Sequence, residues 1–177
     1  NLISAAERRM LINGESQTTI RISDFVGVIP AITGKVELVY EGEQEGPAKV
    51  AQILLSKAIR EDFSHFFPSP ENIKRQHKEN PYQTIISWFN KGNKVDILNN
   101  CNYQEYKKIL YSIPGLSDLV NRFIKNLSEQ EHILFMEFTL HGLSEYSLLS
   151  KNDLEYGIEF KDMLSSMFTL SDDYDEE

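Results

Sequence analysis

Two acid–histidine pairs have the spacing by which a helix presents a carboxylate and an imidazole on one face. Glu129 precedes His132 by three positions, and Asp62 precedes His65 by the same step. In helical bundles this spacing can supply part of a di-iron site, which also needs carboxylates from facing helices. Glu129 also falls in the first turn of a predicted helix, where a carboxylate stabilises the N-terminus. We therefore expect helix-start electrostatics here, and no metal site.

Two further groups could carry chemistry on their own. Glu137 and His141 lie one turn apart on the most apolar predicted helix, and we expect them to form a buried hydrogen-bonded pair. Cys101 has no histidine or basic neighbour in the sequence, so a catalytic thiolate is not expected there. The sequence assigns no catalytic residue.

The sequence lacks a phosphate-binding loop. Such a loop needs the pattern Gly-x-x-x-x-Gly-Lys-Ser/Thr, because its glycines bring backbone donors to the phosphates and its lysine contacts the β and γ oxygens. None of the nine glycines begins that pattern, and no apolar strand ends in Asp-Glu to hold a magnesium ion. We expect no ATP hydrolysis by this chain alone.

Charged clusters without regular apolar spacing are interpreted as solvated segments. Glu41, Glu43 and Glu45 lack the spacing of a calcium loop, and we interpret them as a linker, with a partner-contact loop as the alternative. The basic stretch from Lys74 to Lys78 is interpreted as an exposed loop, with contact to RNA or an acidic partner as the alternative. Trp88 and Phe89 are expected in the core.

Composition bounds the class of protein. Hydrophobic residues make up 41% of 177 residues, which is ordinary for a globular chain. The net charge is −9, and residues 172–177 supply five of these negative charges, so the body is only mildly acidic. This balance disfavours nucleic acid or an anionic membrane as partner. A single cysteine and no apolar run of about 20 residues favour the cytoplasm and no membrane span.

Apolar spacing predicts helices through most of the chain. Ser23 is expected to cap a helix that breaks at Pro30, and residues 35–40 also fit a strand. A turn is expected at 69–71 and a loop at 150–157, while 95–98 is too short to classify. The other predicted helices lie at about 2–12, 47–66, 81–91, 103–110, 116–127, 129–149 and 160–167. The prediction is an all-α, multi-helix orthogonal bundle: a lid-like segment (1–46), a C-terminal helical domain (47–170) and an acidic tail (171–177).

The run RISDFVGVIPAITGKVELVYEGEQEG, residues 21–46, resembles the lid region of magnesium chelatase-like AAA+ ATPases, the clade that includes the MoxR-like proteins. The upstream ISAAERR, residues 3–9, is similar to the lid helix that precedes this run. The later MEFTLHGL, residues 136–143, resembles the tail of long-form members. The resemblance is specific for residues 1–46, weaker near 136–151, and absent between.

The resemblance implies a parent ATPase, of bacterial type, whose ATP and magnesium are held by a core upstream of Asn1. The chain would then be a fragment whose partners are that core, neighbouring subunits of a homo-oligomeric ring and a client protein. In the family a lid arginine contacts the γ-phosphate, but the register of this resemblance places it just before Asn1, so no sensor residue is assigned here. Arg8 and Arg9 lie close enough to be candidates for nucleotide or subunit contact, although surface pairing is the simpler interpretation. Gly42 and Gly46 are hinge candidates. The alternative is a stand-alone helical interaction module without catalytic activity.

Overall fold

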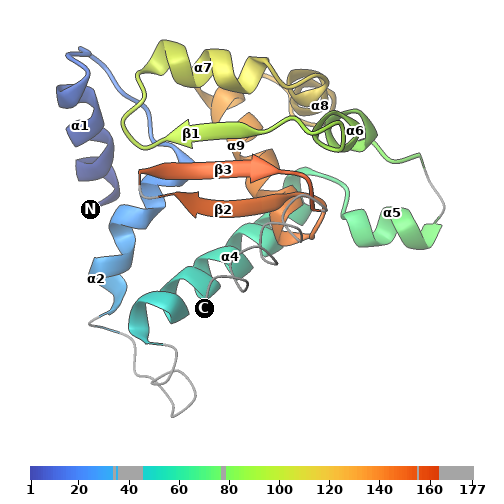
Figure 1. Cartoon of the computed structure of the whole chain (residues 1–177), viewed down its shortest axis with the longest axis horizontal. Helices are drawn as coiled ribbons and strands as arrows, with labels where there is room; N and C mark the ends of the chain where they lie inside the picture. The colour runs from blue at the N-terminus through green and yellow to red at the C-terminus, as the bar shows by residue number, and fades with distance from the viewer. Residues whose placement is uncertain (34, 36–45, 77–78, 155, 164–177) are drawn as a thin grey trace, which may run out of the picture.

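The computed structural model describes residues 1–33, 35, 46–76, 79–154 and 156–163 (Figure 1). Its helices are α1 (Leu2–Ile12), the 3-10 helix η1 (Ile22–Val28), α2 (Ile29–Thr33), α4 (Pro47–Phe66), α5 (Pro70–Gln76), α6 (Gln83–Phe89), α7 (Tyr103–Tyr111), α8 (Leu116–Phe123) and α9 (Glu129–Glu145). Its strands are β1 (Val95–Leu98), β2 (Ser150–Leu154) and β3 (Gly157–Lys161). Within these ranges no helix is long and apolar enough to cross a bilayer.

The small sheet corrects the all-α prediction. The strand order is β1-β3-β2 with both pairs antiparallel, and Val95 pairs with Phe160 while Ile97 pairs with Ile158. These four side chains are buried on one face, which is the alternation of a half-buried strand. The segment 95–98 is thus a strand, part of the expected loop 150–157 is β2, and Phe160 lies in β3 where a helix was expected. The remainder of that expected helix, from 164, is outside the described residues.

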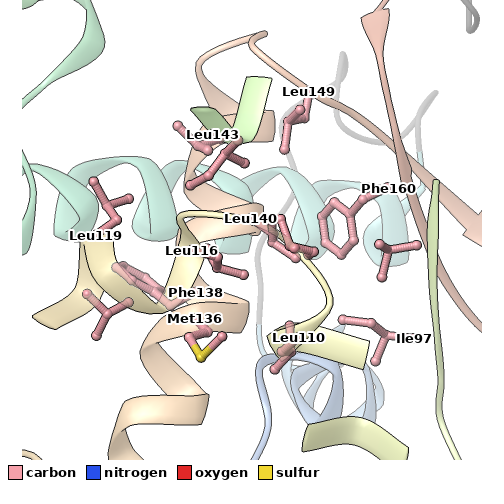
Figure 2. Packing of buried hydrophobic residues seen from close by; sticks show 14 of the residues in the cluster. Ile97, Leu110, Leu116, Leu119, Met136, Phe138, Leu140, Leu143, Leu149 and Phe160 are labelled. Atoms are coloured by element: carbon pink, nitrogen blue, oxygen red, sulfur yellow. The ribbon is translucent and has the colours of Figure 1, made fainter. Parts of the chain in front are cut away.

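Helix α9 forms the centre of the core. It lies behind the sheet in Figure 1, and Figure 2 shows Met136, Leu140 and Leu143 among side chains from several other elements. Met136, Leu140 and Leu143 have no exposed surface, as expected for a helix with apolar residues on nearly all sides. The helix ends at Glu145, earlier than predicted, and Leu149 is buried ahead of β2.

Two capping boxes fix the starts of α7 and α9 at the predicted positions, 103 and 129. The side chains of Asn102 and Ser128 each accept a hydrogen bond from the backbone N–H three residues on, and Glu105 and Glu131 return the contact. Pro47 is the first residue of α4, and the helix bounds 2–12 and 47–66 are as predicted. The expected turn at 69–71 is instead the start of α5, so Lys74 and Arg75 are exposed helical residues.

The region from 22 to 33 differs from its prediction at the cap. The expected break near Pro30 is present as a change of helix type, since η1 gives way to α2 at Ile29. Ser23, however, lies inside η1, and its backbone N–H donates to the Glu137 carboxylate of α9. The Glu137 carboxylate, far away in the sequence, therefore caps this helix in place of the Ser23 side chain. Residues 36–40, which fit either a helix or a strand, lie outside the described residues, and so do Gly42 and the linker glutamates 41, 43 and 45. The domain boundary at 46 stays a prediction.

Close contact between α4 and α9 depends on Gly142. A Cβ added there would lie 2.0 Å from Cδ2 of Phe63, a ring with no exposed surface. No real side chain tolerates that distance, so the ring or the helix would have to move. Gly142 therefore sets the separation of the two longest described helices.

Replacing Gly142 with alanine should lower the free energy of unfolding by about 1–3 kcal/mol, because the core is overpacked at Phe63. Urea denaturation measures the change, with Gln130→Ala on the exposed side of α9 as the control. Adding Phe63→Leu should make the double variant less destabilised than the sum of the two single changes. Strict additivity would contradict the predicted contact.

Candidate functional site

A buried ion pair joins α1 to η1. Arg9 of α1 is 2% exposed, and its guanidinium donates to the carboxylate of Asp24, which is 7% exposed. The same guanidinium donates to the backbone oxygen of Thr19 at 2.6 Å. The second Asp24 oxygen accepts the backbone N–H of Arg21 at 2.8 Å. Arg9 thus holds the loop between α1 and η1 in place.

Arg21 extends these contacts to α7. Its Nη1 donates to the backbone oxygen of Cys101 at 3.0 Å and lies 3.1 Å from the Cys101 sulfur. Its guanidinium carbon lies 4.1 Å from the centre of the Tyr106 ring, a cation–π distance. Arg21 is 2% exposed, so a second buried cation lies on the α7 side of the segment.

Glu137 completes the cluster from α9. Its carboxylate accepts the backbone N–H of Ile22 at 2.7 Å, the backbone N–H of Ser23 at 3.2 Å and the Tyr106 hydroxyl at 2.7 Å. The first turn of a helix has backbone N–H groups without a partner inside the helix. A carboxylate at that end accepts hydrogen bonds from them and is stabilised by the positive end of the helix dipole. We call Arg9, Arg21, Asp24, Tyr106 and Glu137 the buried polar cluster.

The expected Glu137–His141 hydrogen bond is not formed. The distance from His141 Nε2 to Glu137 Oε1 is 3.9 Å, which is too long for a hydrogen bond, although both side chains are buried as predicted. Glu137 is occupied by η1 and Tyr106 instead. Neither ring nitrogen of His141 has a hydrogen-bond partner within the described part of the chain.

Ionisation in the cluster follows from burial and contact. Burial by itself raises the pKa of Glu137, but nearby His141, the Tyr106 hydroxyl and the Ile22 amide lower it, and the resulting pKa lies below the ordinary value. Burial, and then the charge of Glu137, raises the pKa of Tyr106 well above its usual range. Burial raises the pKa of the Cys101 thiol, and Arg21 offsets only part of this. The cluster therefore favours a carboxylate beside a neutral phenol and a neutral thiol.

The two arginines singled out from the sequence have different surroundings. Both line a cleft of about 440 Å³ between α1, η1 and the loop after β1, together with Gly27 and Asn100. Arg8 is exposed, and within the described residues it has no ion pair. Arg9 is buried and paired with Asp24, so the simpler interpretation of surface pairing is wrong for Arg9. Arg8 is the one of the two that is placed to contact an external group.

The hinge candidates are only partly described. Gly42 lies outside the described residues. Gly46 has φ of 82° immediately before Pro47, a backbone conformation that favours glycine. Its hinge role stays a prediction.

The acid–histidine pairs have local partners. Glu129 binds Lys107 and lies 3.4 Å from the Tyr103 hydroxyl, while His132 Nε2 lies 3.0 Å from the Ser117 hydroxyl. Asp62 and His65 are 3.5 Å apart and exposed. In the described ranges no three His, Cys, Asp or Glu residues gather as metal ligands.

Few features of the sequence indicate that Arg9 and Arg21 are buried. Arg9 lies three positions after buried Ala6, on the same side of α1, and Arg21 lies between two isoleucines. Those positions among apolar residues indicate burial. Arginine is rarely buried without a partner, however, and the partners here come from other segments of the chain.

Replacing Glu137 with glutamine should lower the free energy of unfolding by about 3 kcal/mol, because two buried arginines would lose a balancing negative charge. Chemical denaturation measures the effect. Glu129→Gln on the same helix is the control, since it removes an exposed ion pair and should change stability little. Equal effects of the two changes would contradict the assigned role of Glu137.

The Glu137 contribution should also depend on pH. Because its folded-state pKa is lowered, the stabilisation is complete above the unfolded value of about 4.5 and is lost as the pH falls through the folded value. The difference in unfolding free energy between the natural chain and Glu137→Gln should therefore shrink below about pH 4.5. Denaturant titrations of both chains at several pH values test this. A difference that is constant down to the acid limit would contradict it.

Comparison with known proteins gives no match for this chain: none to a family model, none to a curated protein and none to a solved structure.

Proposed function

We propose that this chain is the C-terminal lid and accessory region of a magnesium chelatase-like AAA+ ATPase. In this proposal an upstream core binds ATP and magnesium, and the lid-like segment responds to the nucleotide. The chain then passes that movement to neighbouring subunits of a ring or to a client protein in the cytoplasm. The sequence resemblance of residues 1–46 is the starting point for this proposal.

The structural observation that supports it is the capping of η1 by Glu137. An element that transmits movement must be tied to the body that receives it. Glu137 of α9 holds the backbone of Ile22 and Ser23, and Arg21 reaches Cys101 and Tyr106 on the α7 side. A displacement of α1 and η1 would therefore be carried into the helical core.

The second supporting observation is the exposure of Arg8. In the proposed parent, a lid arginine that meets a phosphate or a neighbouring subunit must reach out of its own segment. Arg8 lies on the exposed side of α1 in the 440 Å³ cleft, while Arg9 is used inside the segment. We therefore assign the external contact to Arg8.

The first test is whether the parent gene encodes a phosphate-binding loop upstream of Asn1. If it does, Arg8→Ala in the full-length parent should lower ATP turnover at least about tenfold, as expected for loss of a cation that stabilises phosphate charge. Arg75→Ala on α5, also exposed, is the matched control. Turnover can be followed by phosphate release.

A parent without a phosphate-binding loop would overturn the proposal and favour the stand-alone interaction module. A parent ATPase whose turnover is the same in Arg8→Ala and Arg75→Ala would leave the lid assignment in place and exclude Arg8 as the contact.

A further inference from the structure

A second cavity lies where α4, α9 and the sheet meet η1 and α2. Its volume is about 460 Å³, within the range of small-molecule sites. Much of its lining is apolar, from side chains on η1, α2, α4 and β3: Ile22, Ile29, Ile53, Leu55, Ile59 and Ile158. The cavity thus has walls that suit an apolar body.

His141 gives this cavity a polar group without a hydrogen bond among the described residues, although the Glu137 carboxylate lies 3.9 Å from its Nε2. The side chain is 3% exposed, its ring lies edge-on to Phe160 at 5.1 Å, and neither nitrogen is hydrogen-bonded within the described residues. A buried imidazole left in this state destabilises the folded chain. A hydrogen-bonding group that enters the cavity and reaches the ring would remove that penalty.

The charge around the cavity favours an anion. Lys49 and Lys57 lie on one face of α4 at the mouth, both exposed and without an ion pair among the described residues. Lys151 is paired with Glu145 at 2.7 Å. Arg60 is paired with Glu71 and also donates to the backbone oxygen of Glu145. Among the described lining residues the remaining acid is Asp153, and the Glu137 carboxylate lies 3.9 Å from His141. The described lining thus has four lysine or arginine cations and two carboxylates.

The edge strand β2 shows that this side of the sheet is not ordinary core. Lys151 and Asp153 pair with Phe160 and Ile158, so all four side chains share one face of the sheet, on which Lys151 is half-buried and Asp153 is exposed. Both charged side chains line the cavity, so this face is open to solvent at the edge strand. Charged residues on an edge strand can also protect a sheet from aggregation, but that role does not require a buried histidine without a hydrogen bond.

We propose that this cavity binds a small organic acid, with its carboxylate accepting a hydrogen bond from His141. Its apolar body would lie against the isoleucines, and the α4 lysines would attract the anion to the mouth. Because Ile22 and Ser23 form part of the wall, the bound acid would also hold η1 against α4 and α9. This site is independent of the proposed ATPase parent.

The test compares octanoate with 1-octanol, which has the same apolar chain and no charge. Calorimetry on the whole chain should show octanoate binding at least about tenfold tighter than octanol, and weaker binding at high salt. His141→Phe removes both ring nitrogens at similar size and should abolish this preference. Because it also removes the imidazole beside the Glu137 carboxylate, octanoate and octanol are compared within this same variant. Lys57→Met should weaken octanoate binding severalfold, while Lys108→Met on α7 is the matched control.

The rate at which Cys101 reacts with a thiol reagent tests whether the acid binds next to η1. The thiol is buried and lies 3.1 Å from Nη1 of Arg21, the residue before Ile22, so movement of this segment should change its rate of reaction with a thiol reagent. Bound octanoate should slow that reaction. Equal affinity for octanoate and octanol, unchanged binding in His141→Phe, or faster Cys101 labelling would each overturn the proposal.

Discussion

One carboxylate inside the core, that of Glu137, determines how the N-terminal segment is attached. It satisfies the first free N–H groups of η1 and the hydroxyl of Tyr106 at once. A buried carboxylate is costly to desolvate, and three donors aimed at one group offset that cost. An apolar side chain at 137 would leave two backbone donors and a phenol without partners. Glu137 therefore both attaches η1 to α9 and keeps these buried donors hydrogen-bonded.

Charge balance explains why the two arginines can be buried beside it. Arg9 and Arg21 bring two positive charges, and Asp24 and Glu137 bring two negative ones. Removing one member leaves an unpaired charge in a poorly solvated site, which costs more than an exposed ion pair contributes. The cluster therefore favours one arrangement of α1, η1 and α7 over looser packings.

Neighbouring residues were enough to predict most helices. Features that depend on residues far apart in the sequence were missed. Asn102 and Ser128 satisfy N–H groups within their own first turns, so adjacent residues suffice to predict those caps. The cap of η1 could not be predicted this way, because it comes from Glu137 more than a hundred positions later. The sheet was missed for the same reason: β1 has only four residues and gains its partner from β3 across the chain. Of the candidate site, the burial of Glu137 and His141 was predictable, and their partners were not.

Successive turns of α9 serve different neighbours. Glu137 holds η1, His141 one turn later borders the second cavity, and Gly142 next to it lets Phe63 of α4 approach. Glu137 and His141 are four positions apart on α9, so the cavity and the attachment of η1 are separated by about one helical turn. An acid bound at His141, as proposed, would therefore lie next to the carboxylate that holds η1.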